Sequence, residues 1–191
     1  MTYPMTSPMY LKSMLPKHGP YLPKSLHHKT QKLTKKEQKT SFDIDLDKMR
    51  HYCGYQERCF FDLREKAKRI GLSFNDLERM IPILEQEEFY NEARFAIHFA
   101  GGKFRLKKWG KYKIRQQLRS KMVPKPLIEK AIALIPDEDY VETLRQLIIQ
   151  KNKEYGNTPH KNYAKLARFF AQKGYEASLF QQEFNQLFPR L

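Results

Sequence analysis

The sequence predicts an all-α fold: a tandem array of three three-helix repeats, each helix-turn-helix-like in outline. Apolar residues recur at the helical period from Asp45 onward, and no stretch shows the alternation typical of a strand. The chain also repeats itself, because segment 62–72 superposes on 113–123 and then on 165–175, at offsets of 51 and 52 positions. The same offsets align apolar positions in the helix that follows each segment. One supersecondary unit is therefore used three times, and such units bury their apolar faces by stacking.

The first repeat is expected over residues 45–89. Asp45 or Asp47 is a candidate N-cap for its first helix, whose apolar face carries Leu46, Met49, Tyr52 and Cys53. The second helix carries Phe60, Leu63, Ala67 and Ile70, and Gly71 fits a left-handed C-terminal stop. Ser73, with Asp76 three residues later, predicts the start of the third helix. Pro82 lies inside that helix and is expected to bend or shorten it.

The second repeat is expected over residues 91–136. Asn91 is a good N-cap for its first helix, and the sequence leaves open whether this helix continues past Gly101–Gly102 or breaks there. The second helix turns Ile114 and Leu118 inward. Pro124 or Pro126 opens the third, which spans 127–135 and ends at Pro136.

The third repeat is expected over residues 139–188, after an acidic turn at 137–139. A loop at 156–159 separates its first two helices. The four phenylalanines of its last two helices are interpreted as core rather than as a stacking platform; they are Phe169, Phe170, Phe180 and Phe184.

The composition points to an anionic partner. The 191 residues carry a formal net charge of +15, which favours binding to a polyanion or to an acidic protein face. Two cysteines indicate a reducing compartment without a disulfide framework. No run approaches the ~18 apolar residues of a membrane span. We therefore expect a cytoplasmic protein.

Residues 1–41 form a basic tail that holds eight lysines, one acid and five of the eleven prolines. Such a segment buries too little to offset its ordering entropy, so disorder is expected. The tail is either a basic arm that adds non-specific affinity for nucleic acid or a solvated extension. A start assigned too far upstream of Met5, Met9 or Met14 is a further alternative.

Three stretches resemble the RecX family, regulators of the RecA recombinase. They are the acidic-then-Arg-Phe-Ala string at 87–96, the basic segment Trp109 to Leu118, with its Gly-x-x-x-Ile-Arg-x-x-Leu pattern, and the helix and stop at 165–175. The resemblance covers residues 45–188 and respects the three-unit organisation. Glu88 and Met122 stand where that family usually has glycine, so those helix ends are expected to differ. Lys111 stands where proline is common in that family.

The resemblance implies an elongated, curved monomer that lodges in the groove of the RecA–DNA filament. There it would lower ATP hydrolysis and strand exchange, in recombinational repair and the SOS response. The implied partners are the RecA filament and single- and double-stranded DNA, bound without sequence specificity.

The strongest candidate binding surface lies in the second repeat, where cations alternate with aromatic residues and no acid occurs between Lys103 and Pro126. This pattern suits phosphate contact combined with stacking. Lys111, Arg115 and Arg119 are spaced to lie along one stripe of a helix. A solvated helix face is the alternative, and Trp109 is equally suited to packing between units. The candidates are Lys103, Arg105, Lys107, Lys108, Trp109, Lys111, Tyr112, Lys113, Arg115, Arg119 and Lys121.

Weaker candidates lie in and after the first repeat. Asp62 and Glu65 dilute the cluster formed by Arg64, Lys66, Lys68 and Arg69. Arg94 has two interpretations: it reaches the filament, or it pairs with Asn91, Glu92 or a neighbouring helix end. The second is favoured.

Enzyme chemistry finds little support in the sequence. His51, Cys53 and Cys59 lack a fourth ligand and the usual zinc spacing, and Gly101–Gly102 lacks the flanks of a phosphate-binding loop. We expect no catalysis, cofactor or metal. Two alternatives to recombinase regulation stay open: a helix-turn-helix-like direct DNA-binding regulator, and a helical-repeat scaffold for acidic proteins.

Overall fold

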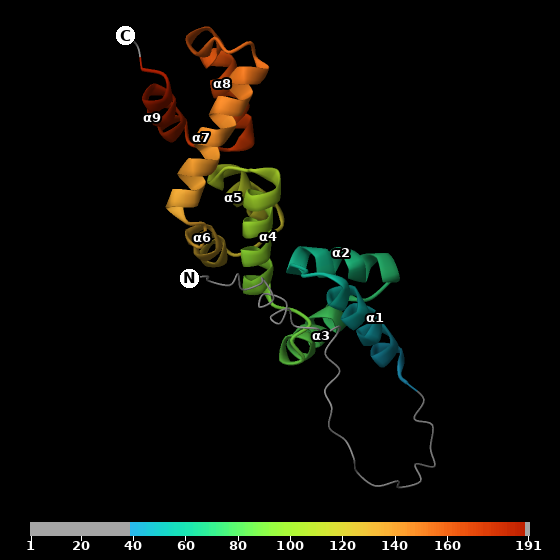
Figure 1. Ribbon diagram of the computed structural model, residues 1–191. Helices are drawn as coiled ribbons and strands as arrows, with labels where there is room; N and C mark the ends of the chain where they lie inside the picture. The colour runs from blue at the N-terminus through green and yellow to red at the C-terminus, as the bar shows by residue number, and fades with distance from the viewer. Residues whose placement is uncertain (1–38, 190–191) are drawn as a thin grey trace, which may run out of the picture. The chain divides into compact units, whose positions relative to one another are not determined.

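The computed structural model describes residues 39–189, and these residues form nine α-helices without a strand. Figure 1 shows the helices following one another as three triplets, and the main helix packing occurs within each triplet. The all-α array of three-helix repeats is confirmed, whereas the residue limits of the three repeats stay predictions. Up to residue 38, the predicted basic tail lies outside the described residues. The helices are α1 (Ser41–Tyr55), α2 (Phe60–Ile70), α3 (Phe74–Gln86), α4 (Glu92–Lys107), α5 (Lys111–Ser120), α6 (Lys125–Ala133), α7 (Asp137–Glu154), α8 (Pro159–Lys173) and α9 (Ala177–Leu187).

The first helix begins earlier than predicted, because Thr40 rather than Asp45 or Asp47 is its N-cap. The Thr40 hydroxyl accepts from the Asp43 amide at 3.1 Å, and the Asp43 carboxylate accepts from the Thr40 amide at 3.0 Å. This reciprocal capping box satisfies two amides that the first turn leaves without partners. Ser41, assigned to the tail by the sequence, therefore belongs to α1.

Several other helix ends are set by a capping side chain or by a residue in the left-handed conformation. Gly71 takes the predicted left-handed conformation with φ 74°, and the Ser73 and Asn91 side chains cap α3 and α4 as predicted. Glu88 and Met122 also adopt a positive φ of 61°. These two helix ends are thus built with the left-handed turn that glycine would supply, contrary to the expectation that they differ.

The structure also decides what happens at the glycine pair, at two prolines and at the acidic residues 137–139. α4 continues through Gly101–Gly102 to Lys107. Pro82 does not shorten α3, which runs to Gln86 with the proline on its exposed face. α6 begins at Lys125, after Pro124, and ends at Ala133, two residues earlier than predicted. The acids at 137–139 form the first turn of α7 rather than a turn before it, because anionic side chains are favoured at a helix N-terminus.

Two clusters of buried side chains form the core. The first triplet has its own cluster, with Met49, Leu63 and Leu77 fully buried. A second, continuous cluster includes Cys59, just before α2, and runs through the second and third triplets to Phe184 on α9. The second and third triplets therefore share apolar packing, and the contacts between triplets decide where the polar surface residues lie.

The second and third triplets meet at what we call the second junction, where two backbones touch. The Gly110 amide donates to the Lys173 carbonyl at 2.9 Å, and the Tyr112 amide donates to the Gly174 carbonyl at 3.1 Å. A Cβ atom at Gly110 would lie 2.1 Å from the Gly174 oxygen, and one at Gly174 would lie 2.3 Å from the Lys113 Cβ. The turn before α5 thus docks directly on the end of α8, and only glycine fits at these two positions.

The first and second triplets meet at the first junction through side chains. Lys121 Nζ lies 3.0 Å from Asp62 Oδ1, and the Phe60 amide donates to Glu92 Oε2 at 2.8 Å. Partial burial raises the pKa of Asp62, but the hydrogen bonds from Lys121 and Cys59 outweigh it, so the pKa lies below its ordinary value. The ionised carboxylate therefore stabilises this junction.

Replacing Gly110 with Ala should lower the free energy of unfolding by about 3 kcal/mol, because the new methyl group meets backbone that cannot rotate aside. Urea unfolding measures the change. Gly102→Ala is the matched control: a Cβ there meets nothing within 4 Å. It lies inside α4 and should raise the free energy by about 0.5–1 kcal/mol. Equal stability of Gly110→Ala and the wild type would contradict the close approach.

A double-mutant cycle with Asp62→Asn and Lys121→Met should show a coupling free energy of about 1 kcal/mol near neutral pH. Since the folded pKa of Asp62 is lowered, this stability is present above the unfolded pKa of about 3.9 and is lost as the pH falls through the folded pKa. Urea unfolding of the four proteins across this range measures it. A coupling that grows on acidification would contradict the assignment.

Candidate nucleic-acid and filament interface

The predicted cationic stripe on α5 is interrupted by acids from other helices. Lys111 Nζ lies 2.5 Å from Asp137 Oδ1 at the start of α7, and Arg115 Nε lies 3.0 Å from Glu129 Oε2 on α6. The hydrogen bond from Lys111 holds the pKa of Asp137 below its ordinary value. Of the three stripe residues, only Arg119 is exposed without an ion pair to another described residue. Lys121 is likewise held at the first junction.

Three of the predicted cations that stay exposed lie at the end of α4. Arg105, Lys107 and Lys108 are exposed, and none forms an ion pair within residues 39–189. Lys108 is the C-cap of α4 and takes a left-handed φ of 53°. Tyr112, at the start of α5, is also exposed. Together with Arg119, these side chains are the predicted candidates that are exposed and form no ion pair within residues 39–189.

Trp109 is half-buried and packs against the shared core of the second and third triplets. Lys103 Nζ and Lys113 Nζ lie 5.2 and 4.9 Å from the centroid of its ring. Both distances are typical of cation–π contacts. The tryptophan is therefore a packed junction residue with two ammonium groups against it, and it is not an open stacking platform.

The structure adds a lysine that sequence reasoning missed. Lys173, at the end of α8, donates from Nζ to the Lys107 carbonyl at 3.1 Å, and Lys113 Nζ donates to the Gln172 carbonyl at 3.1 Å. Burial lowers the pKa of Lys173, and the charges of Lys113, Lys151 and Lys107 lower it further. The sequence signal was present, because the repeat alignment superposes Lys173 on Lys121. We call Lys107, Lys113 and Lys173 the junction lysines.

The weaker candidates are held within or beside the first triplet. Each of the four cations on α2 lies against an aromatic ring or an acceptor of the same triplet: Arg64 on Phe61, Lys66 on Tyr52, Lys68 on the Glu65 carboxylate and Arg69 on the Glu65 carbonyl. Arg94 Nε lies 2.6 Å from Glu57 Oε1, and its Nη2 donates to the Glu88 carbonyl at 2.8 Å. Arg94 therefore fastens a helix end, with Glu57 as a partner that the sequence did not suggest.

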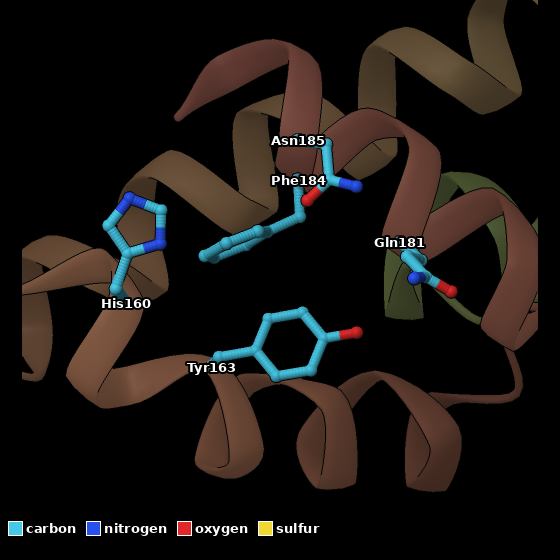
Figure 2. A pocket seen from close by; sticks show the side chains of 5 residues that line it. All are labelled: His160, Tyr163, Gln181, Phe184 and Asn185. Atoms are coloured by element: carbon cyan, nitrogen blue, oxygen red, sulfur yellow. The ribbon is translucent and has the colours of Figure 1, made fainter. Parts of the chain in front are cut away.

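A pocket of about 600 Å³ lies between α8 and α9. Figure 2 shows the side chains around it: His160, Tyr163, Gln181, Phe184 and Asn185. Tyr163 meets Phe184 edge-on, with ring centroids 4.9 Å apart, and Phe184 is only 1% exposed, so it belongs to the core as predicted. No lysine or arginine is among these lining residues, so the pocket lacks the permanent cations that a phosphate site would use.

The two cysteines are buried thiols. Burial raises the pKa of Cys53 to about 11 and that of Cys59 to about 12, so both stay protonated at neutral pH. Residues 39–189 contain no group of three or more His, Cys, Asp or Glu side chains that could hold a metal ion. Over the same residues, no helix combines the length and apolarity that crossing a membrane requires.

Two family models match the chain: the second three-helix domain of RecX over residues 91–132 and the third over 137–182. Among similar proteins, the regulatory protein RecX of Prosthecochloris aestuarii is 26% identical over 136 residues, which cover 71% of this chain and 88% of the relative. The regulatory protein RecX of Chlorobium phaeobacteroides is 24% identical over 152 residues, covering 80% and 96% of the two chains.

Solved structures show the same fold. The crystal structure of RecX from Lactobacillus salivarius superposes with a TM-score of 0.70 at 18% identity, covering 76% of this chain and 96% of that one. A second crystal structure, of a regulatory protein RecX, gives a TM-score of 0.67 at 22% identity and covers 74% and 70% of the two chains. The three-helix triplets, the two matched domain models and the similar proteins all point to the same family. The chain belongs to the RecX family of regulatory proteins.

Proposed function

We propose that this chain regulates the RecA recombinase by lodging in the groove of its filament on DNA, where it lowers ATP hydrolysis and strand exchange. The observation that carries the proposal is the group of exposed cations at the end of α4 in a member of the RecX family: Arg105, Lys107 and Lys108, with Arg119 on α5. Arginine forks onto phosphate or carboxylate oxygens, while lysine acts as a point charge. Such a surface suits a groove that carries DNA phosphates.

The contacts between triplets explain how binding would inhibit. Direct backbone hydrogen bonds and a continuous apolar core join the second triplet to the third, so the pair resists being pulled apart. A body of this kind, once fixed across neighbouring RecA subunits, restrains the rearrangements that ATP turnover requires. This role needs binding energy alone and no catalytic group.

Changing Arg105, Lys107, Lys108 and Arg119 together to Gln should abolish most of the inhibition, because these side chains form no ion pair within residues 39–189 whose loss would disturb the fold. The slope of log affinity for single-stranded DNA against log salt concentration should also fall by about 3. The measurement is a titration of RecA on single-stranded DNA, with ATP hydrolysis followed at two salt concentrations.

The matched control removes four exposed charges elsewhere, at Lys125, Lys130, Lys153 and Lys161, and should retain inhibition. Full inhibition by the folded four-cation variant would reject this surface. If the wild type instead selected one operator sequence tightly, direct DNA regulation would be favoured. If it bound neither single-stranded DNA nor the filament, a scaffold for acidic proteins would be favoured.

A further inference from the structure

The two junctions use the same positions of the repeat. The offsets of 51 and 52 residues place Lys113 on Asp62 and Lys173 on Lys121. At the first junction these positions hold an ion pair, with Lys121 Nζ 3.0 Å from Asp62 Oδ1. At the second junction both positions are lysine. The carboxylate that fastens one junction has been replaced by a second ammonium group at the other.

The two ammonium groups of the second junction contact carbonyls instead of acids. Lys113 Nζ donates to the Gln172 carbonyl and Lys173 Nζ to the Lys107 carbonyl, each at 3.1 Å. A carbonyl accepts a hydrogen bond but brings no full negative charge. Each ammonium has three N–H donors, and each of these contacts uses one of them. Donors and uncompensated positive charge therefore remain at the junction.

Further positive charges lie close to these two ammonium groups. Lys107 ends α4 beside Lys173, and the charges of Lys113, Lys151 and Lys107 all act on the Lys173 ammonium. Lys151 is compensated by Glu154, whereas the three junction lysines form no ion pair within the part of the chain that the structure describes. Trp109 lies against Lys113 and Phe169 against Lys173, so apolar ring faces border the ammonium groups and reduce their hydration.

We propose that the second junction is a phosphate site, in which a phosphodiester of a single DNA strand takes the place that the Asp62 carboxylate occupies at the first junction. The phosphate bridges Lys113 and Lys173, one on each side of the junction. Binding therefore fastens the third triplet to the second. The inference rests on the proposed function for the choice of DNA as the source of the phosphate.

A phosphodiester suits the site better than an isolated carboxylate because the strand continues past it. Lys107 belongs both to the junction lysines and to the exposed cations at the end of α4. A strand with one phosphate at the junction can present neighbouring phosphates to Lys108 and Arg105. Several such contacts add to affinity and to its salt dependence.

The test is Lys113→Asp, which rebuilds the ion pair of the first junction at the second. The variant should be more stable than the wild type to thermal unfolding without DNA. Its affinity for single-stranded oligothymidylate should fall about tenfold or more, and the salt slope should fall by about 1 or more. Trp109, the only tryptophan and 4.9 Å from the Lys113 ammonium, reports binding by its fluorescence.

The matched control is Lys125→Asp, which makes the same change of charge in the first turn of α6 at an exposed position. It should lose much less affinity than Lys113→Asp. Lys113→Gln, which removes the charge without adding a partner, should weaken binding without the gain in stability. The strand should raise the melting temperature of the wild type and of Lys125→Asp far more than that of Lys113→Asp, and inorganic phosphate should do so only weakly.

Equal affinity of Lys113→Asp and Lys125→Asp for the strand would overturn the phosphate site. Binding of polyglutamate as tight as that of oligothymidylate would also overturn it, because an acidic protein chain would then be the occupant. RecA is absent from these measurements. Failure here would therefore leave the regulatory proposal standing, because that proposal is tested by the inhibition of ATP hydrolysis in the titration with RecA.

Discussion

The close approach of the backbones at Gly110 and Gly174 is the constraint on which the arrangement of the second and third triplets depends. Two amides before and within α5 bond to the last carbonyls of α8, which a side chain on either glycine would prevent. The contact also brings Lys113 beside the end of α8 and Lys173 beside the end of α4. The close contact that the two glycines allow thus brings Lys107, Lys113 and Lys173 together.

Both junctions follow one plan with different chemistry. In each, a helix of the following triplet supplies an acceptor to the first amide of the preceding triplet's second helix. Glu92 accepts from Phe60 at the first junction, and the Tyr140 hydroxyl accepts from Lys111 at the second. This arrangement satisfies helix-start amides that would otherwise lack partners. The side chains at the two junctions differ: the first is joined by the Asp62–Lys121 ion pair, whereas Lys113 and Lys173 at the second contact carbonyls.

The distribution of charge changes between the sequence and the folded chain. The stretch from Lys103 to Pro126 contains no acid, yet Asp137 and Glu129 approach its cations from α7 and α6. In both pairs the acid is exposed to solvent, and surface ion pairs contribute only about 0–1 kcal/mol each, so these pairs do little for stability. They engage Lys111 and Arg115, whereas four other predicted cations stay exposed without an ion pair among the described residues: Arg105, Lys107, Lys108 and Arg119.

The sequence by itself determined the helical fold, its repeat and several helix ends, because helical periodicity and capping act over a few residues. For this reason the sequence predicted the helix stop at Gly71 and the N-caps Ser73 and Asn91. The capping box of Thr40 and Asp43 is also a local sequence pattern, although the first helix was predicted to begin later. Only the tertiary structure decided which cations are paired. The partners of Lys121 and Lys113 stand 59 positions away in the chain, and no local pattern reports a contact that packing alone creates.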